Sequence, residues 1–152
     1  MEDNTLFQGS DVFIIGNGFD LDLGLKTSYH DFYVSDDWPF NKPNTLMGAF
    51  LNHERSVNNW MDLEYKIGEY AVRSYCHDLK QEGRPYRQED YNDFCKLIKS
   101  LEKHLSIAEE SPINQQSTAA IVLTRFLNSF SIPTIISFNY TDIQKIVKKK
   151  LN

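Results

Sequence analysis

The chain has 152 residues, of which 41% are hydrophobic and 13% aromatic. That length supports one well-buried core and leaves little room for two full domains. The 21 acidic residues outnumber the 16 Lys and Arg, giving a net charge of −5. The bases form no stripe interleaved with aromatic residues, so we do not expect nucleic acid as the principal partner. The one basic run, Lys148 to Lys150, is typical of a solvated helix end.

Cysteine usage and the N-terminus predict the compartment. Cys76 and Cys95 fall within helical patterns, with no histidine pair at metal-ligand spacing, which predicts reduced, buried thiols and no metal site. The first ten residues are acidic and polar, unlike a signal peptide, and no apolar stretch is long enough to span a membrane. We therefore predict a soluble, cytoplasmic protein with no membrane partner. A homo-oligomer is left open.

The first predicted element is a strand over residues 12–15, whose unbroken apolar run is typical of a parallel strand covered on both faces. A short helix is expected over residues 19–23, with Gly24 as its C-terminal cap. Thr27 or Ser28 can cap the next helix, and residues 36–44 are predicted as a loop because they contain two prolines.

Helical periodicity dominates the middle of the chain. It predicts a long helix over residues 57–80, a second through residues 94–105 and a third over residues 115–130. A second strand at residues 134–138 then leads to a terminal helix at 142–150. We expect a single α/β domain over residues 1–152, with a helical insertion at about 27–130 between two parallel strands.

Two parallel strands place their carboxyl ends at the same edge of a sheet. The segments Gly16-Asn17-Gly18 and Asn139-Tyr140-Thr141 should therefore lie close together. A parallel sheet of two strands is a poor structure by itself, because such sheets normally belong to a larger set. Either further strands are hidden in the pattern, or the chain is the front part of a larger, truncated domain.

The turn Gly16-Asn17-Gly18 follows the first strand and precedes a helix that starts near Phe19, the context of a phosphate-binding loop. Its glycines would allow positive φ and a close approach of the backbone to a ligand. The full dinucleotide fingerprint is absent, since the third glycine is missing and Asp20 stands two residues after Gly18. The alternative is a tight turn that only connects two elements.

Two acids are candidates for a role at this site. Asp20 would accept hydrogen bonds from a ribose diol, or would simply stabilise the dipole of its helix. Glu64 falls beside Leu63 within an apolar stripe, where a carboxylate is costly unless it is paired. It is a site residue, or else it reaches water at the edge of the stripe or pairs with a neighbouring arginine such as Arg125.

At the end of the second strand, Asn139 has an amide that can both donate and accept hydrogen bonds, which suits a nucleotide. Tyr140 would stack or pack, and Thr141 would cap the final helix. The four histidines are interpreted as surface or core residues, since none has a clear acid or nucleophile partner: His30, His53, His77 and His104.

Three blocks together resemble the AbiH family of bacteriophage abortive-infection proteins. They are residues 15–21 with 24–29 and Phe32, then Trp60-Met61-Asp62-Leu63-Glu64, then Phe138-Asn139-Tyr140-Thr141. That family is distantly similar to sirtuin-like domains, in which a glycine loop and an asparagine-containing strand end hold NAD. The resemblance implies a Rossmann-like pocket whose positions carry over as Gly16, Asn17, Gly18, Asp20, Glu64 and Asn139.

Two departures affect the transfer of this chemistry. Sirtuin-like strand ends carry an acid where this chain has Thr141, although Asp142 follows. Family members also continue into a segment with a His-Gly pair that would supply a catalytic base, whereas this chain ends at Asn152. The resemblance therefore implies a truncated sheet and leaves the chain without an evident catalytic histidine.

The resemblance implies a phage-defence protein that binds a nucleotide such as NAD. Backbone amides after Gly16 would hold a phosphate, and Phe19 and Tyr140 would complete the pocket. Asn139, together with Asp20 or Glu64, would position the ribose and the bond to be cleaved if the full-length form is a glycohydrolase. The alternatives are a non-enzymatic sensor or interaction module, whose helices bind a phage or host protein, and an inactive truncated remnant.

Overall fold

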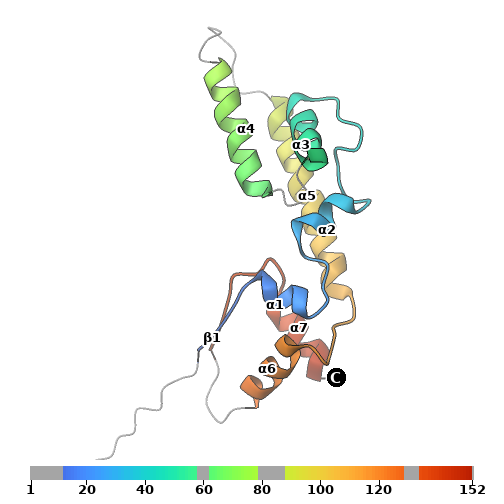
Figure 1. Ribbon diagram of the computed structural model, residues 1–152, viewed down its shortest axis with the longest axis vertical. Helices are drawn as coiled ribbons and strands as arrows, with labels where there is room; N and C mark the ends of the chain where they lie inside the picture. The colour runs from blue at the N-terminus through green and yellow to red at the C-terminus, as the bar shows by residue number, and fades with distance from the viewer. Residues whose placement is uncertain (1–11, 58–61, 79–87, 129–133, 152) are drawn as a thin grey trace, which may run out of the picture. The chain divides into compact units, whose positions relative to one another are not determined.

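A computed structural model describes residues 12–57, 62–78, 88–128 and 134–151. In chain order its elements, all labelled in Figure 1 except β2, are β1 (Val12–Ile15), α1 (Asn17–Asp22), α2 (Tyr29–Val34), α3 (Leu46–Val57), α4 (Leu63–Asp78), α5 (Gln88–Glu110), α6 (Thr118–Leu127), β2 (Thr134–Ser137) and α7 (Ile143–Leu151). The fold is thus mixed α/β, mostly helical, with a parallel sheet of two strands among the described residues. A Rossmann-like or sirtuin-like arrangement stays a prediction.

The chain divides into two compact units, each with its own hydrophobic core. Unit 1 combines Met1–Thr27 with Ala108–Asn152, and unit 2 is Ser28–Ile107. The helical insertion predicted at about 27–130 therefore supplies all of unit 2, and its last part returns to unit 1 as α6.

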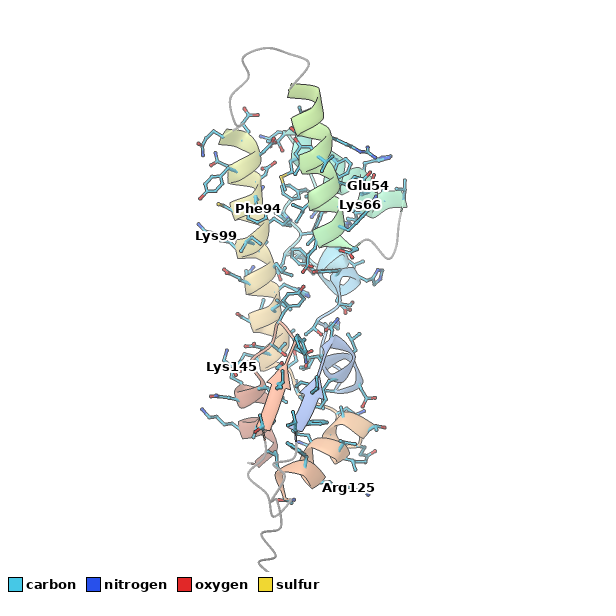
Figure 2. All side chains as sticks on the ribbon, turned by 90° about the vertical axis from the view of Figure 1, so that its left-hand side faces the viewer. Glu54, Lys66, Phe94, Lys99, Arg125 and Lys145 are labelled. Atoms are coloured by element: carbon cyan, nitrogen blue, oxygen red, sulfur yellow. The ribbon has the colours of Figure 1, made fainter. Side chains whose placement is uncertain are left out.

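The sheet belongs to unit 1 and is parallel, as predicted, with Val12 paired to Thr134 and Ile15 to Ser137. Figure 2 shows the two strands side by side. One face packs on α6 and α7 through residues that alternate along the strands; the core there contains Leu23, Leu25, Ala119, Ala120, Leu123 and Ile146, with Phe13 and Ile135 partly buried against it.

The prediction that β1 is covered on both faces is wrong for the described residues. Val12 and Ile14 are 52% and 63% exposed, and Ile136, the partner of Ile14, is also exposed. Among the described residues, the helices of unit 1 pack on one side of the strand pair, and the other side keeps an apolar surface that parallel sheets usually bury.

The end of α1 follows from its glycine. Gly24 has φ +83°, a left-handed conformation that a Cβ disfavours. Its N–H donates to the Leu21 carbonyl, and the Leu25 N–H donates to the Asp20 carbonyl at 3.0 Å. These two bonds form a Schellman motif, so the predicted cap at Gly24 is confirmed.

In unit 2, α2 starts with the predicted cap at Ser28, whose hydroxyl accepts from the Asp31 N–H while the Asp31 carboxylate accepts from the Ser28 N–H. The core of this unit is aromatic and contains Phe32, Tyr33, Trp38, Phe40, Met47, Leu51, Leu63 and Leu97. Helix α3 was not predicted. It follows the expected loop, and Thr45 caps it by accepting from the Gly48 N–H.

The helix predicted over residues 57–80 is shorter at its start. Helix α3 ends at Val57, residues 58–61 lie outside the described residues, and α4 begins at Leu63. Asp62 caps α4 by accepting from the Tyr65 N–H at 2.9 Å. The predicted helices over residues 115–130 and 142–150 correspond to the shorter α6 and to α7.

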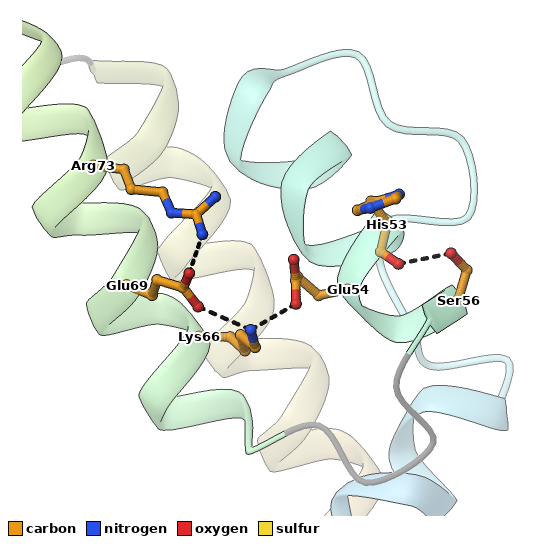
Figure 3. Close-up of polar contacts among 6 residues, drawn as sticks. All are labelled: His53, Glu54, Ser56, Lys66, Glu69 and Arg73. Carbon is orange, nitrogen blue, oxygen red and sulfur yellow. Dashed lines mark hydrogen bonds and ion pairs between the residues drawn. The ribbon is translucent and has the colours of Figure 1, made fainter.

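An ion network joins α3 to α4 (Figure 3). Lys66 lies between Glu54, at 2.7 Å, and Glu69, at 2.8 Å, and Glu69 also pairs with Arg73. Lys66 is only 17% exposed while Arg73 is 64% exposed, so the central lysine is the better shielded cation. Over the described part of the chain, no helix combines the length and apolar character needed to cross a bilayer.

Candidate functional site

The carboxyl ends of β1 and β2 meet at one edge of unit 1. The Phe138 N–H donates to the Ile15 carbonyl at 2.9 Å, extending the strand pairing by one residue. From this point the chain turns into α1 after β1 and into residues 138–142 after β2. The Gly16-Asn17-Gly18 turn and the Asn139-Tyr140-Thr141 segment were predicted to lie close together, and this is confirmed. The Asn139 and Thr141 side chains both donate hydrogen bonds to Asp20, two residues after Gly18 in α1.

Asp20 is the centre of this cluster. It lies in the first turn of α1 and is fully buried, at 0% exposure. The Asn139 side-chain N–H donates to Asp20 Oδ1 at 2.8 Å, and the Thr141 hydroxyl donates to Asp20 Oδ2 at 2.5 Å. Each carboxylate oxygen thus has a charge-assisted partner, and together they fasten the segment after β2 to α1.

These bonds change two predictions. Thr141 does not cap the final helix, because its hydroxyl is directed to Asp20. The cap of α7 is Asp142, whose carboxylate accepts from the Gln144 N–H at 2.9 Å. Asp20 also does more than stabilise the helix dipole from the helix surface. It is buried, and its two hydrogen bonds connect α1 to the segment after β2.

Burial raises the pKa of Asp20 above its usual 3.8, because a desolvated carboxylate disfavours its charge. The hydrogen bonds from Thr141 and Asn139 act in the opposite direction, and the negative charge of Glu109 adds to the increase. Asp20 is therefore a carboxylate whose ionised form depends on its two donors.

Asn139 carries the one buried side-chain polar atom that lacks a hydrogen-bond partner within the described part of the chain, its Oδ1. Its nitrogen faces Asp20, so the amide is satisfied on one side only. Buried acceptors of this kind are uncommon in folded proteins. The residue as a whole is partly exposed, although this atom is buried.

The glycine turn lies beside this cluster, but its backbone differs from the expectation. Gly16 has φ −134°, an extended conformation open to any residue, and no described residue other than Gly24 has positive φ. A Cβ at Gly16 or Gly18 would meet no atom within 4 Å. Packing among the described residues therefore does not require glycine at either position, and they leave the surface over the first turn of α1 open.

The neighbouring residues of the turn contribute to the fold. Asn17 accepts a hydrogen bond from the Thr27 hydroxyl at 3.0 Å, which ties both ends of the α1 region together. Phe19 is partly buried and meets Phe13 edge-on, with ring centroids 6.1 Å apart. Tyr140, in contrast, is 52% exposed. Asn17 and Phe19 thus both make contacts within unit 1.

Glu64 lies in unit 2, in the first turn of α4, and is exposed. It accepts a hydrogen bond from the Tyr29 hydroxyl at 2.8 Å. The prediction that it stands inside the apolar stripe is wrong, because Leu63 and Ile67 face the core and Glu64 points away from it. Arg125, the suggested partner, belongs to unit 1.

Glu109 was missed by the sequence reasoning. The residue is 7% exposed, and its carboxylate accepts from the Asp142 N–H at 2.7 Å and from Lys145 at 2.6 Å. Figure 2 labels Lys145, on α7. A signal was present, since Glu109 follows Leu105 by four residues and so shares the buried face of α5. Glu109 fixes the start of α7 and hence the segment that carries Asn139.

Metal and base chemistry are not evident in the described residues. They contain no group of three or more His, Cys, Asp or Glu that could hold a metal ion. Of the histidines, His104 is buried in unit 2 with its Nδ1 3.6 Å from Asp37. Cys95 is a free, partly buried cysteine, whereas the side chains of Cys76 and His77 lie outside the described ones.

Comparison with known proteins yields one match. The family model described as bacteriophage abortive infection AbiH matches residues 12–151, which include both strands and the whole cluster around Asp20. Trp60 and Met61, part of the second block of the resemblance, lie outside the described residues. No curated protein and no solved structure matches the chain, so the likeness to sirtuin-like domains stays a prediction. The chain belongs to the AbiH family of bacteriophage abortive infection proteins.

Proposed function

We propose that this chain acts in abortive phage defence by binding a nucleotide at the strand ends of unit 1. The observation that carries the proposal is the buried cluster of Asp20, Asn139 and Thr141, which leaves Asn139 Oδ1 without a partner beside an open glycine turn. Ligands of open α/β sheets bind outside the carboxyl ends of parallel strands, where this cluster lies.

Two features support a small ligand at this edge. The first turn of α1 has no Cβ at Gly16 and Gly18, so a ligand could approach its backbone closely. Glycine at the second of these positions also weakens the helix by about 0.5–1 kcal/mol relative to alanine. A residue that lowers helix stability and has no internal packing role is readily explained by contact with another molecule.

The ligand we propose is a nucleotide, with NAD as the first candidate. Binding is better supported than hydrolysis. Cleavage of a glycosidic bond needs a positioned carboxylate or base, whereas both oxygens of Asp20 already accept hydrogen bonds. No histidine is identified in the cluster among the described residues.

A panel of NAD, ATP and AMP tested by thermal shift examines the binding, and release of nicotinamide measured on the same samples separates binding from turnover. Asn139→Ala should abolish the shift and also lower phage protection in cells. Asn128→Ala, at the exposed end of α6, is the matched control and should retain both. If Asn139→Ala protects cells as well as the unchanged chain does, the helices act as an interaction module and the site is not used.

A further inference from the structure

The orientation of the Asn139 amide is set by chemistry. An ionised carboxylate only accepts hydrogen bonds, so Asn139 must turn its NH₂ group to Asp20. The observed bond, Nδ2 to Oδ1 at 2.8 Å, has that polarity. The amide oxygen must then face away from Asp20, and this is the atom that has no partner in the described part of the chain.

The same bonds use most of the donors of the cluster. Thr141 directs its hydroxyl hydrogen to Asp20 as well, so the second N–H of the Asn139 amide is the one side-chain donor left beside the acceptor oxygens of these three residues. The nearby Glu109 adds negative charge, and its cationic partner Lys145 is already paired with it at 2.6 Å. A phosphate group would be repelled here, whereas a hydroxyl or N–H donor would be attracted.

We infer that Asp20 is a positioning residue that presents Asn139 Oδ1 as an acceptor, and that the ligand places a hydroxyl or N–H donor against it. The inference rests on the proposed function and makes it more specific: the sugar or the amide of a nucleotide lies at this end of the site, and its phosphate does not. A free phosphate ion is then a poor ligand for the cluster.

Access to Oδ1 requires a displacement of the segment after β2. The atom is buried in the ligand-free chain, although Asn139 is partly exposed. Its neighbours Phe138 and Tyr140 are 74% and 52% exposed, so they take little part in the packing of the core. Between the backbone bond of Phe138 to Ile15 and the bond of the Asp142 N–H to Glu109, the side-chain bonds to Asp20 hold this segment, and a ligand that binds Oδ1 would have to shift it there.

The test uses four forms of the chain with NAD as the probe and inorganic phosphate as the competitor. Asp20→Asn keeps the shape and can still bond to both neighbours, but its amide lets Asn139 adopt either orientation. Asn139→Asp sets two carboxylates against each other. In the double variant D20N/N139D, the amide at position 20 donates to the carboxylate at position 139, so the hydrogen bond is restored in the opposite direction. The second carboxylate oxygen at position 139 still faces the ligand as an acceptor.

We expect Asp20→Asn to melt near the temperature of the unchanged chain. It should bind NAD about tenfold more weakly, because one hydrogen bond from the ligand to Asn139 Oδ1 is lost. Asn139→Asp should lose both stability and binding. The double variant should regain both. A purely structural role predicts instead that binding follows the melting temperature in every form. Unchanged NAD binding by Asp20→Asn, or displacement of NAD by phosphate at equal concentration, would overturn the inference.

A second readout needs no ligand. The side-chain NH₂ protons of Asn139 should exchange slowly with solvent in nuclear magnetic resonance spectra, and faster in Asp20→Asn. If they are protected but NAD does not bind, the positioning by Asp20 stands and the proposed function fails. If they exchange freely in the unchanged chain, the positioning itself is refuted whatever the ligand.

Discussion

Replacing Gly18 with alanine separates the needs of the fold from those of a ligand. Gly18 lies in the first turn of α1, and the new methyl group would meet no atom within 4 Å. Alanine removes the entropic cost of a helical glycine, so the folded state should gain about 0.5–1 kcal/mol. For a chain of this size, the melting temperature should rise by about 1–4 °C.

The same methyl group would occupy the open surface over the strand ends. Gly18→Ala should therefore weaken NAD binding at least about tenfold, equivalent to about 1.4 kcal/mol, while making the protein more stable. Circular dichroism on heating and titration calorimetry measure the two effects. Gly68→Ala in α4 is the matched control, since its Cβ also meets nothing within 4 Å; it should raise stability and leave binding unchanged. A loss of stability in Gly18→Ala, or undiminished binding, would refute the reasoning.

Three further predictions concern the fold. Gly24→Ala should destabilise the protein by about 1–2 kcal/mol in urea unfolding, because φ at this position is +83°; unchanged stability would mean that the Schellman motif is not formed. The raised pKa of Asp20 means that the folded state holds its proton more tightly than the unfolded chain, so this group's contribution to stability declines as pH rises from 3.8 through the raised pKa. The free energy of unfolding of the unchanged chain, minus that of Asp20→Asn, should therefore be larger at pH 4 than at pH 7, and the opposite slope would contradict the assignment. Lys66→Met should lower the melting temperature more than Arg73→Ala, because Lys66 is 17% exposed and joins α3 to α4 whereas Arg73 is 64% exposed; equal effects would show that the network contributes little.

The elements that could be predicted are those with local signals. The unbroken apolar run of β1, the glycine after α1 and the Ser28 and Asp31 box each specify structure within a few residues. Helix α3 was missed because Gly48 interrupts its pattern. The structure explains this glycine, since a Cβ there would come within 2.8 Å of Thr45 Oγ1 and 2.9 Å of Phe40 Cδ1. Close packing between distant residues is not visible in the periodicity.

The candidate site was predictable in position and less so in detail. Parallel pairing of the strands brings Gly16 and Asn139 to one edge, and that follows from the connection alone. Whether Asp20 points to solvent or to the interior depends on the core around Leu23, three residues later on the same face of α1. Its bonds to Asn139 and Thr141 span 119 and 121 residues, beyond any local pattern.

The exposed side of the sheet differs from the prediction that β1 is covered on both faces. Val12 and Ile14 read as residues of a strand covered on both faces, and the prediction of covering layers rested on what parallel sheets usually do. In the described residues they are exposed, since α6 and α7 pack only on the other side. Apolar residues in a strand indicate that a face of the sheet is suited to burial. They do not indicate which segment covers that face.

The location of the ligand is the central claim, and a titration of isotope-labelled protein with NAD, followed by nuclear magnetic resonance, tests it most directly. A ligand at the strand ends should cause saturable shifts in the backbone amides of Gly16 to Gly18 and of Asn139 to Thr141, with the Gly68 amide of α4 unchanged. Shifts confined to unit 2, or none at NAD concentrations up to the millimolar range, would contradict a nucleotide site at the ends of β1 and β2.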